Sequence, residues 1–140
     1  MKLTFKTIIT AAALAGVSAA FINSLLYFIF HASGIIPDNV FIQENQPLTV
    51  VPVIISSVVP SLLAGIVFYL LCWYTSKGYR IFSIIALLLL VLSFANPFMS
   101  IPGIPLAMGL ALNGMHVVVV ASLLYFFRGI KGAESKVALQ

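Results

Sequence analysis

The sequence predicts an all-α, polytopic membrane protein: an antiparallel bundle of four transmembrane helices with both termini in the cytoplasm. Composition is the first reason, because 62% of the 140 residues are hydrophobic, only 7% are charged and the mean hydropathy is +1.19. A water-soluble domain of this length exposes much of its surface and needs more charged side chains to cover it. The other two reasons are four long apolar segments and a set of basic residues confined to one side of the bundle.

Each of the four apolar segments approaches the ~20 residues that cross ~30 Å of hydrocarbon as a helix. The segments cover approximately residues 7–30, 48–74, 81–99 and 106–127. Backbone polar groups in lipid must be paired within their own segment, which favours helices. Residues 84–92 show no alternation of polar and apolar side chains, so a β-barrel is excluded.

These segments form a single transmembrane domain, residues 1–128, followed by a polar cytoplasmic tail at 129–140. The longest connection is an outer loop, residues 31–47, which can cap one end of the bundle and contains the turn residues Gly34 and Pro37. The other connections are short, so successive helices should pack as antiparallel neighbours. The first segment resembles a secretory signal, but its apolar run exceeds twenty residues, and we expect it to be retained as a helix.

The charges define an orientation. All seven lysines and arginines fall on one predicted side: Lys2, Lys6, Lys77, Arg80, Arg128, Lys131 and Lys136. The opposite side has Asp38 and Glu44 and neither Lys nor Arg. Basic residues mark the cytoplasmic side of membrane proteins and contact lipid head groups there. We therefore expect a lipid bilayer as partner, together with a second copy or another membrane protein, and no nucleic acid.

Polar residues gather at one depth, in the outer half of the predicted bundle. Helical spacing puts Asn23 and Tyr27 on one face of the first segment, and the other segments contribute residues at overlapping depths. This polar layer consists of Asn23, Tyr27, Ser56, Ser93, Asn96, Asn113 and His116. Such groups either hydrogen-bond neighbouring helices to one another or line a ligand pocket. Small residues, Ala12, Gly16 and Ala20, predict that the inner half of the first helix packs against another helix.

His116 is the most distinctive member of the layer, since it lies about ten residues from either end of its segment. As an interhelical hydrogen-bonding group it should face Asn23 and Asn96. The other histidine, His31, lies at the outer edge, so a haem or metal pair is not favoured. No G-x-S-x-G motif occurs, and Cys72 is the only cysteine. We therefore predict no catalytic residue, no metal site and no cofactor.

Three stretches, in order, resemble an uncharacterised family of small four-helix bacterial membrane proteins, a domain of unknown function: PLTVVPVIISSVVPSLLAG, LSFANPF and LALNGMHVVVVASLL. The matching features are Pro52, Pro60, Pro97 and His116. The resemblance implies the four-helix architecture and a multi-pass location in the bacterial cytoplasmic (inner) membrane. It implies no activity.

We expect a small non-enzymatic integral membrane protein that binds a lipophilic ligand, or a partner transmembrane helix, through the polar layer. The alternative is a small transporter or channel subunit that acts as an oligomer. A third class, a quinone- or redox-linked membrane enzyme, depends on His116 alone.

Overall fold

The computed structural model describes residues 4–43 and 46–137. Its elements in chain order are α1 (Phe5–Ala32), β1 (Phe41–Gln43), β2 (Gln46–Pro47), α2 (Val50–Tyr74), α3 (Gly78–Ser93), α4 (Asn96–Ser100) and α5 (Leu106–Val137). The predicted helical class is confirmed. Two residues used in the charge argument, Lys2 and Glu44, lie outside the described residues.

Three helices are long and apolar enough to cross a membrane: α1, α2 and the Leu106–Ile130 part of α5. α3 is also apolar but has only 16 residues, or about 24 Å at the helical rise of 1.5 Å per residue. These lengths support the membrane character that the composition predicts.

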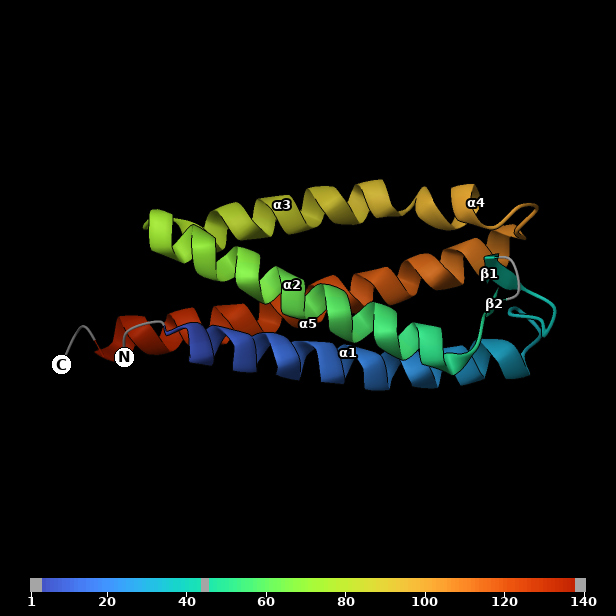
Figure 1. Ribbon diagram of the computed structural model, residues 1–140, viewed down its shortest axis with the longest axis horizontal. Coiled ribbons are helices and arrows are strands. Elements are labelled where there is room, and N and C mark those ends of the chain that lie inside the picture. Colours follow the sequence, from blue (N-terminus) through green and yellow to red (C-terminus); the bar gives the residue numbers. More distant parts are fainter. Residues whose placement is uncertain (1–3, 44–45, 138–140) are drawn as a thin grey trace.

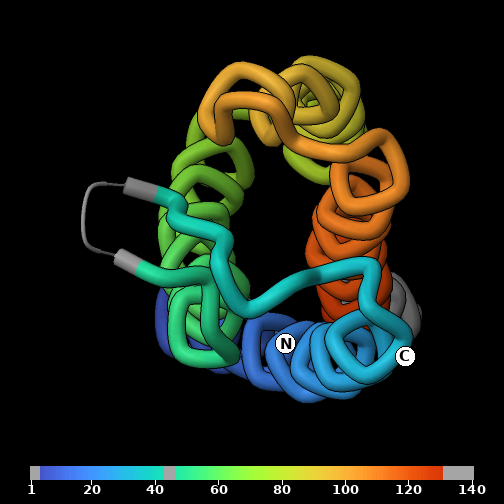
Figure 2. The backbone as a smooth tube through the Cα atoms, turned by 90° about the vertical axis from the view of Figure 1, so that its right-hand side faces the viewer, coloured from blue at the N-terminus to red at the C-terminus, as the bar shows by residue number. Residues whose placement is uncertain are grey.

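α1, α2, α3 and α5 surround a common interior and run alternately in opposite directions (Figures 1 and 2). α1 contacts α2 and α5, and α3 contacts the same two helices from the other side. We call the end where α1 begins the basic end, because Lys6, Lys77, Arg80 and Arg128 belong to it (Figure 1). The opposite end, with β1 and β2, is the hairpin end. Toward the hairpin end α2 diverges from α3 and α4 (Figure 1).

Small residues bring α1 and α2 into close contact. A Cβ atom added at Gly65 would lie 2.6 Å from the Cβ of Ala12, and one added at Gly16 would lie 3.0 Å from the Cβ of Ser61. Larger side chains at these positions would force the two helices apart. The predicted small-residue face of α1 therefore packs against α2, and Ala20 on the same face is buried.

An aromatic cluster fills the interior near the basic end. The rings of Phe68 and Phe127 are stacked, with centroids 4.3 Å apart, and Phe82 meets both rings edge-on. All three side chains are buried. The aromatic cluster thus joins α2, α3 and α5 at the end where they are close together.

The third predicted segment, residues 81–99, is divided in the structure. α3 ends at Ser93, and the N–H groups of Phe94 and Ala95 reach the carbonyl three residues back instead of four. Pro97, in the first turn of α4, has no N–H to donate to the carbonyl of Ser93. The regular hydrogen-bond pattern therefore breaks and restarts as the short helix α4.

Two segments outside the four predicted helices also contain regular structure. The outer loop contains a small antiparallel hairpin, in which Phe41 pairs with Pro47 and Gln43 with Gln46. The predicted tail at 129–140 is helical as far as Val137, because no proline interrupts α5 after Arg128.

Candidate functional site

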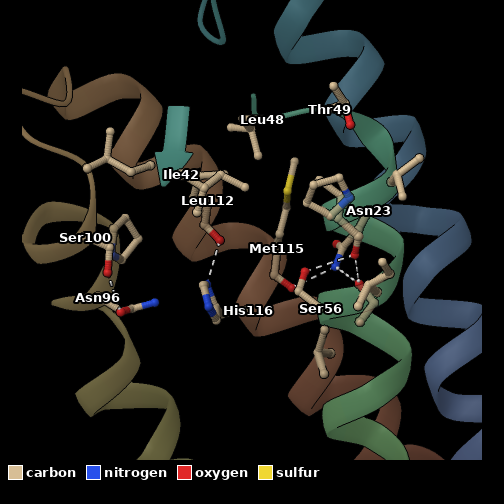
Figure 3. A pocket seen from close by; sticks show the side chains of 18 of the residues that line it. Asn23, Ile42, Leu48, Thr49, Ser56, Asn96, Ser100, Leu112, Met115 and His116 are labelled. Carbon is tan, nitrogen blue, oxygen red and sulfur yellow. Dashed lines mark hydrogen bonds between the residues drawn. The ribbon is translucent and has the colours of Figure 1, made fainter. Parts of the chain in front are cut away.

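A cavity of about 590 Å³ lies at the hairpin end, where α2 diverges from α4 (Figure 3). Side chains of α2, α4 and α5 form its walls, and Ile42 and Leu48 of the hairpin region lie over it. Most of the lining is apolar. The polar lining residues are Asn23, Thr49, Ser56, Ser57, Asn96, Ser100 and His116. No Asp, Glu, Lys or Arg occurs among the lining residues that the structure describes.

Asn23, like the fully buried Ser57, is a deeply buried polar residue of the cavity lining, with 2% of its surface exposed. Its Nδ2 group donates to Ser57 Oγ at 3.0 Å and to the carbonyl oxygen of Met115 at 3.1 Å. A carbonyl can only accept, and the Ser57 hydroxyl already donates to Val53 O, so the amide orientation is fixed.

The carbonyl oxygen of the Asn23 side chain, Oδ1, is buried and has no hydrogen-bond partner among the described residues. An unpaired buried acceptor costs about 1–3 kcal/mol.

His116 lies in the cavity between Asn96 on one side and Ser56 on the other (Figure 3). Its Nδ1 atom is 2.9 Å from the carbonyl oxygen of Leu112, one turn earlier in α5. Because the carbonyl accepts, Nδ1 carries the proton, and in the neutral ring Nε2 is an acceptor. The expected bonds from His116 to Asn23 and Asn96 are not made, so this histidine does not join helices.

Ser56, Ser100 and Asn96 form hydrogen bonds with residues close to them in the chain. Ser56 Oγ donates to Val53 O at 3.1 Å, and Ser100 Oγ donates to Asn96 Oδ1 at 2.9 Å. These bonds use the hydroxyl protons and leave oxygen lone pairs. The Nδ2 group of Asn96 has no partner among the described residues.

Tyr27 holds the loop above the cavity and does not line it. Its hydroxyl donates to the carbonyl of Leu48 at 3.1 Å, and its ring stacks on His31 with centroids 5.7 Å apart. His31 in turn donates from Nδ1 to Ile36 O at 2.9 Å and lies 3.3 Å from Asp38 through Nε2. The outer turns of α1 therefore position the loop.

Asn113 and Ser93 also lie outside the cavity lining. Asn113 donates from Nδ2 to the carbonyl of Phe94 at 3.1 Å and supports the break between α3 and α4. Ser93 donates to Leu90 O at 2.7 Å, within its own helix. The structure thus brings four of the seven predicted residues together at the cavity: Asn23, Ser56, Asn96 and His116.

The predicted polar layer omits Ser57, Ser100 and the hairpin residues Ile42 and Leu48. Ser57 could have been found from its spacing, because Ser57 and Ser61 are four residues apart and so share one helix face. Both are fully buried in the structure. Nothing in the sequence indicates that the hairpin folds over this cavity. Within the described ranges, no group of three or more His, Cys, Asp or Glu side chains could hold a metal ion.

The fold and the cavity define a helical protein with apolar helices that can cross a membrane and with a largely apolar cavity at the hairpin end, whose described lining residues carry no charge. The chain belongs to a family of unknown function, DUF6069, which matches residues 4–132. The resemblance to such a family is thereby confirmed. No curated protein and no solved structure matches the chain.

Proposed function

We propose that the protein is a four-span protein of a bacterial inner membrane that binds an uncharged lipophilic molecule in the cavity. Exposed apolar side chains support the membrane location: Phe21 on α1 is 67% exposed and Leu92 on α3 is 71% exposed. In water such surfaces aggregate, whereas lipid tails cover them. α3 and α4 together, from Gly78 to Ser100, supply the length that α3 alone lacks.

The charges support an orientation with both termini in the cytoplasm. The basic end includes Lys6, Lys77, Arg80 and Arg128, whereas the hairpin end has Asp38. Basic residues stay on the cytoplasmic side when a membrane protein inserts. The cavity then lies in the outer half of the membrane.

The observation that carries the binding proposal is a largely apolar cavity with polar atoms on lining residues that have no partner in the described part of the chain, the buried Oδ1 of Asn23 and Nε2 of His116. Its volume falls in the range of about 300–1,000 Å³ that is usual for ligand sites. A charged head group would need an opposite charge in the lining, and none occurs among the described lining residues. Exposed residues of the lining, Val51 and Ile55, offer a path from the bilayer.

The aromatic cluster favours binding over conduction. Phe68, Phe82 and Phe127 occupy the interior between the cavity and the basic end. A continuous pore through one copy would have to displace these buried rings. A transporter or channel role would therefore need an oligomer, with its path between copies.

The proposal is tested by identifying the lipids that co-purify with the full chain in detergent. Ser56→Trp should fill the cavity and abolish retention of the lipophile. Val59→Trp is the matched control, because Val59 lies on the same helix, is exposed and does not line the cavity. Equal retention by both variants would place the lipid elsewhere, and a co-purifying protein in place of a lipid would favour a partner helix.

A further inference from the structure

The unpaired hydrogen-bonding atoms of the cavity are mostly acceptors. Asn23 commits both N–H groups, to Ser57 and Met115, and keeps the buried Oδ1 without a donor among the described residues. The amide cannot be reversed, because Oδ1 would then face the carbonyl oxygen of Met115. The first free group is therefore an acceptor.

His116 supplies a second acceptor. Since Nδ1 donates to Leu112 O, the lone pair of the neutral ring is on Nε2, for which the described residues offer no partner. The hydroxyl protons of Ser56 and Ser100 are also already used in hydrogen bonds, so each hydroxyl oxygen can only accept a further bond.

Two lining side chains can donate. Asn96 uses only its Oδ1, which accepts from Ser100, so its Nδ2 is free to donate. Thr49 has a rotatable hydroxyl at the exposed rim. A ligand hydroxyl matches this set, because it can donate to His116 Nε2 and accept from Asn96 Nδ2. An ether or ketone oxygen only accepts and leaves the Nε2 acceptor of His116 unpaired.

We infer that the cavity selects uncharged lipophiles with a hydroxyl head group, such as long-chain alcohols and alkylphenols, over the matching ethers and ketones. This inference rests on the proposed function and names its ligand class. Neither an ammonium nor a phosphate head group finds a countercharge among the described lining residues. The alkyl chain packs on apolar lining residues such as Leu112 and Val119.

The test compares two probes with the same ring and alkyl chain, 4-nonylphenol and its methyl ether, 4-nonylanisole. Their dissociation constants are measured on the full chain in detergent, from the ligand-dependent rise of the thermal midpoint at equal mole fractions in the micelle. We expect the phenol to bind at least about tenfold more tightly, since a site built from unpaired acceptors rejects an analogue that lacks the donor.

His116→Phe removes one acceptor and keeps an aromatic ring. In this variant the ratio of the two dissociation constants should fall by about threefold or more. Unchanged binding of the anisole would show that the cavity is intact. Equal affinity of the two probes for the unmodified chain would overturn the inference and leave the proposed function standing. If His116→Phe prefers the phenol as strongly as the unmodified chain does, Nε2 does not contribute to the selection. If neither probe binds, the proposed function fails, and the inference fails with it.

Discussion

Asn23 on α1 donates a hydrogen bond to the carbonyl oxygen of Met115 on α5, although 92 positions separate the two residues in the chain. The same amide group donates to Ser57 on α2. One buried side chain therefore ties three helices together beside the cavity, and its carbonyl oxygen has no partner among the described residues.

Replacing Asn23 with leucine should lower the free energy of unfolding in detergent by about 1–2 kcal/mol, because two interhelical hydrogen bonds are lost. Ser24→Ala is the control, since the Ser24 hydroxyl donates only to Ala20 O within α1. Its effect should stay within about 0.5 kcal/mol. Equal losses in the two variants would show that Asn23 does not join the helices.

The contact between α1 and α2 can be tested with two glycines. Gly65→Ala should destabilise the protein by about 1–3 kcal/mol, because its methyl group would collide with Ala12. Gly114→Ala, on α5, meets nothing within 4 Å and should stabilise by about 0.4–1 kcal/mol through the lower entropy of the unfolded chain. The thermal midpoint in detergent should therefore fall in Gly65→Ala and rise in Gly114→Ala. A stabilising effect at Gly65 would contradict the close packing.

Tyr27→Phe removes the hydroxyl that holds Leu48, and the loop over the cavity should open more often. Amide hydrogen exchange at Leu48, whose N–H donates to Val40 O at 2.8 Å, should become faster, by about fivefold for a bond worth 1 kcal/mol. Tyr125→Phe serves as the control, because Tyr125 is exposed on α5 far from the loop. No change at Leu48 would show that other contacts hold the loop.

His116 should matter for binding and little for stability. Its hydrogen bond lies within α5, so His116→Leu and His116→Gln should each change the free energy of unfolding by less than about 0.5 kcal/mol. Retention of the co-purifying lipophile should fall in the leucine variant. A loss of stability in His116→Leu that His116→Gln restores would indicate an interhelical role instead.

The orientation has a direct test. A reporter that is active only in the cytoplasm should be active when fused after Arg128 and inactive when inserted at Asn39, because basic residues mark the inner side. The reverse pattern would place the basic end outside. A mature protein beginning near Phe21 would show that the first segment is removed as a signal.

Apolar length and helical spacing were enough to predict that the four apolar segments are helical, apart from the break after Ser93, and that Asn23, Asn96 and His116 lie together. Spacing gives the face of a side chain but not its partner. Tyr27 and Asn113 share depth with the cavity residues, yet Tyr27 bonds to the loop and Asn113 to the carbonyl of Phe94. These partners depend on how the loop folds and where α3 breaks, which the sequence pattern does not encode.

The divergence of α2 from α4 could not be predicted either. It follows from contacts between residues far apart in the chain. Near the basic end Phe68 packs on Phe82 and Phe127, which holds α2 to α3 and α5, whereas nearer the hairpin end Ser57 bonds to Asn23 of α1. Proline at position 97 indicated an end to the third helix. The predicted boundary at residue 99 missed the break, because the apolar run continues through it.

The position of the aromatic cluster has a consequence for lipid traffic. Phe68, Phe82 and Phe127 fill the interior on the side of the basic end, and the cavity lies toward the hairpin end. With the basic end in the cytoplasm, an occupant would exchange with the outer leaflet alone. Occupancy would then follow the composition of one leaflet, and a lipid confined to the inner leaflet would reach the site only after it had been flipped across.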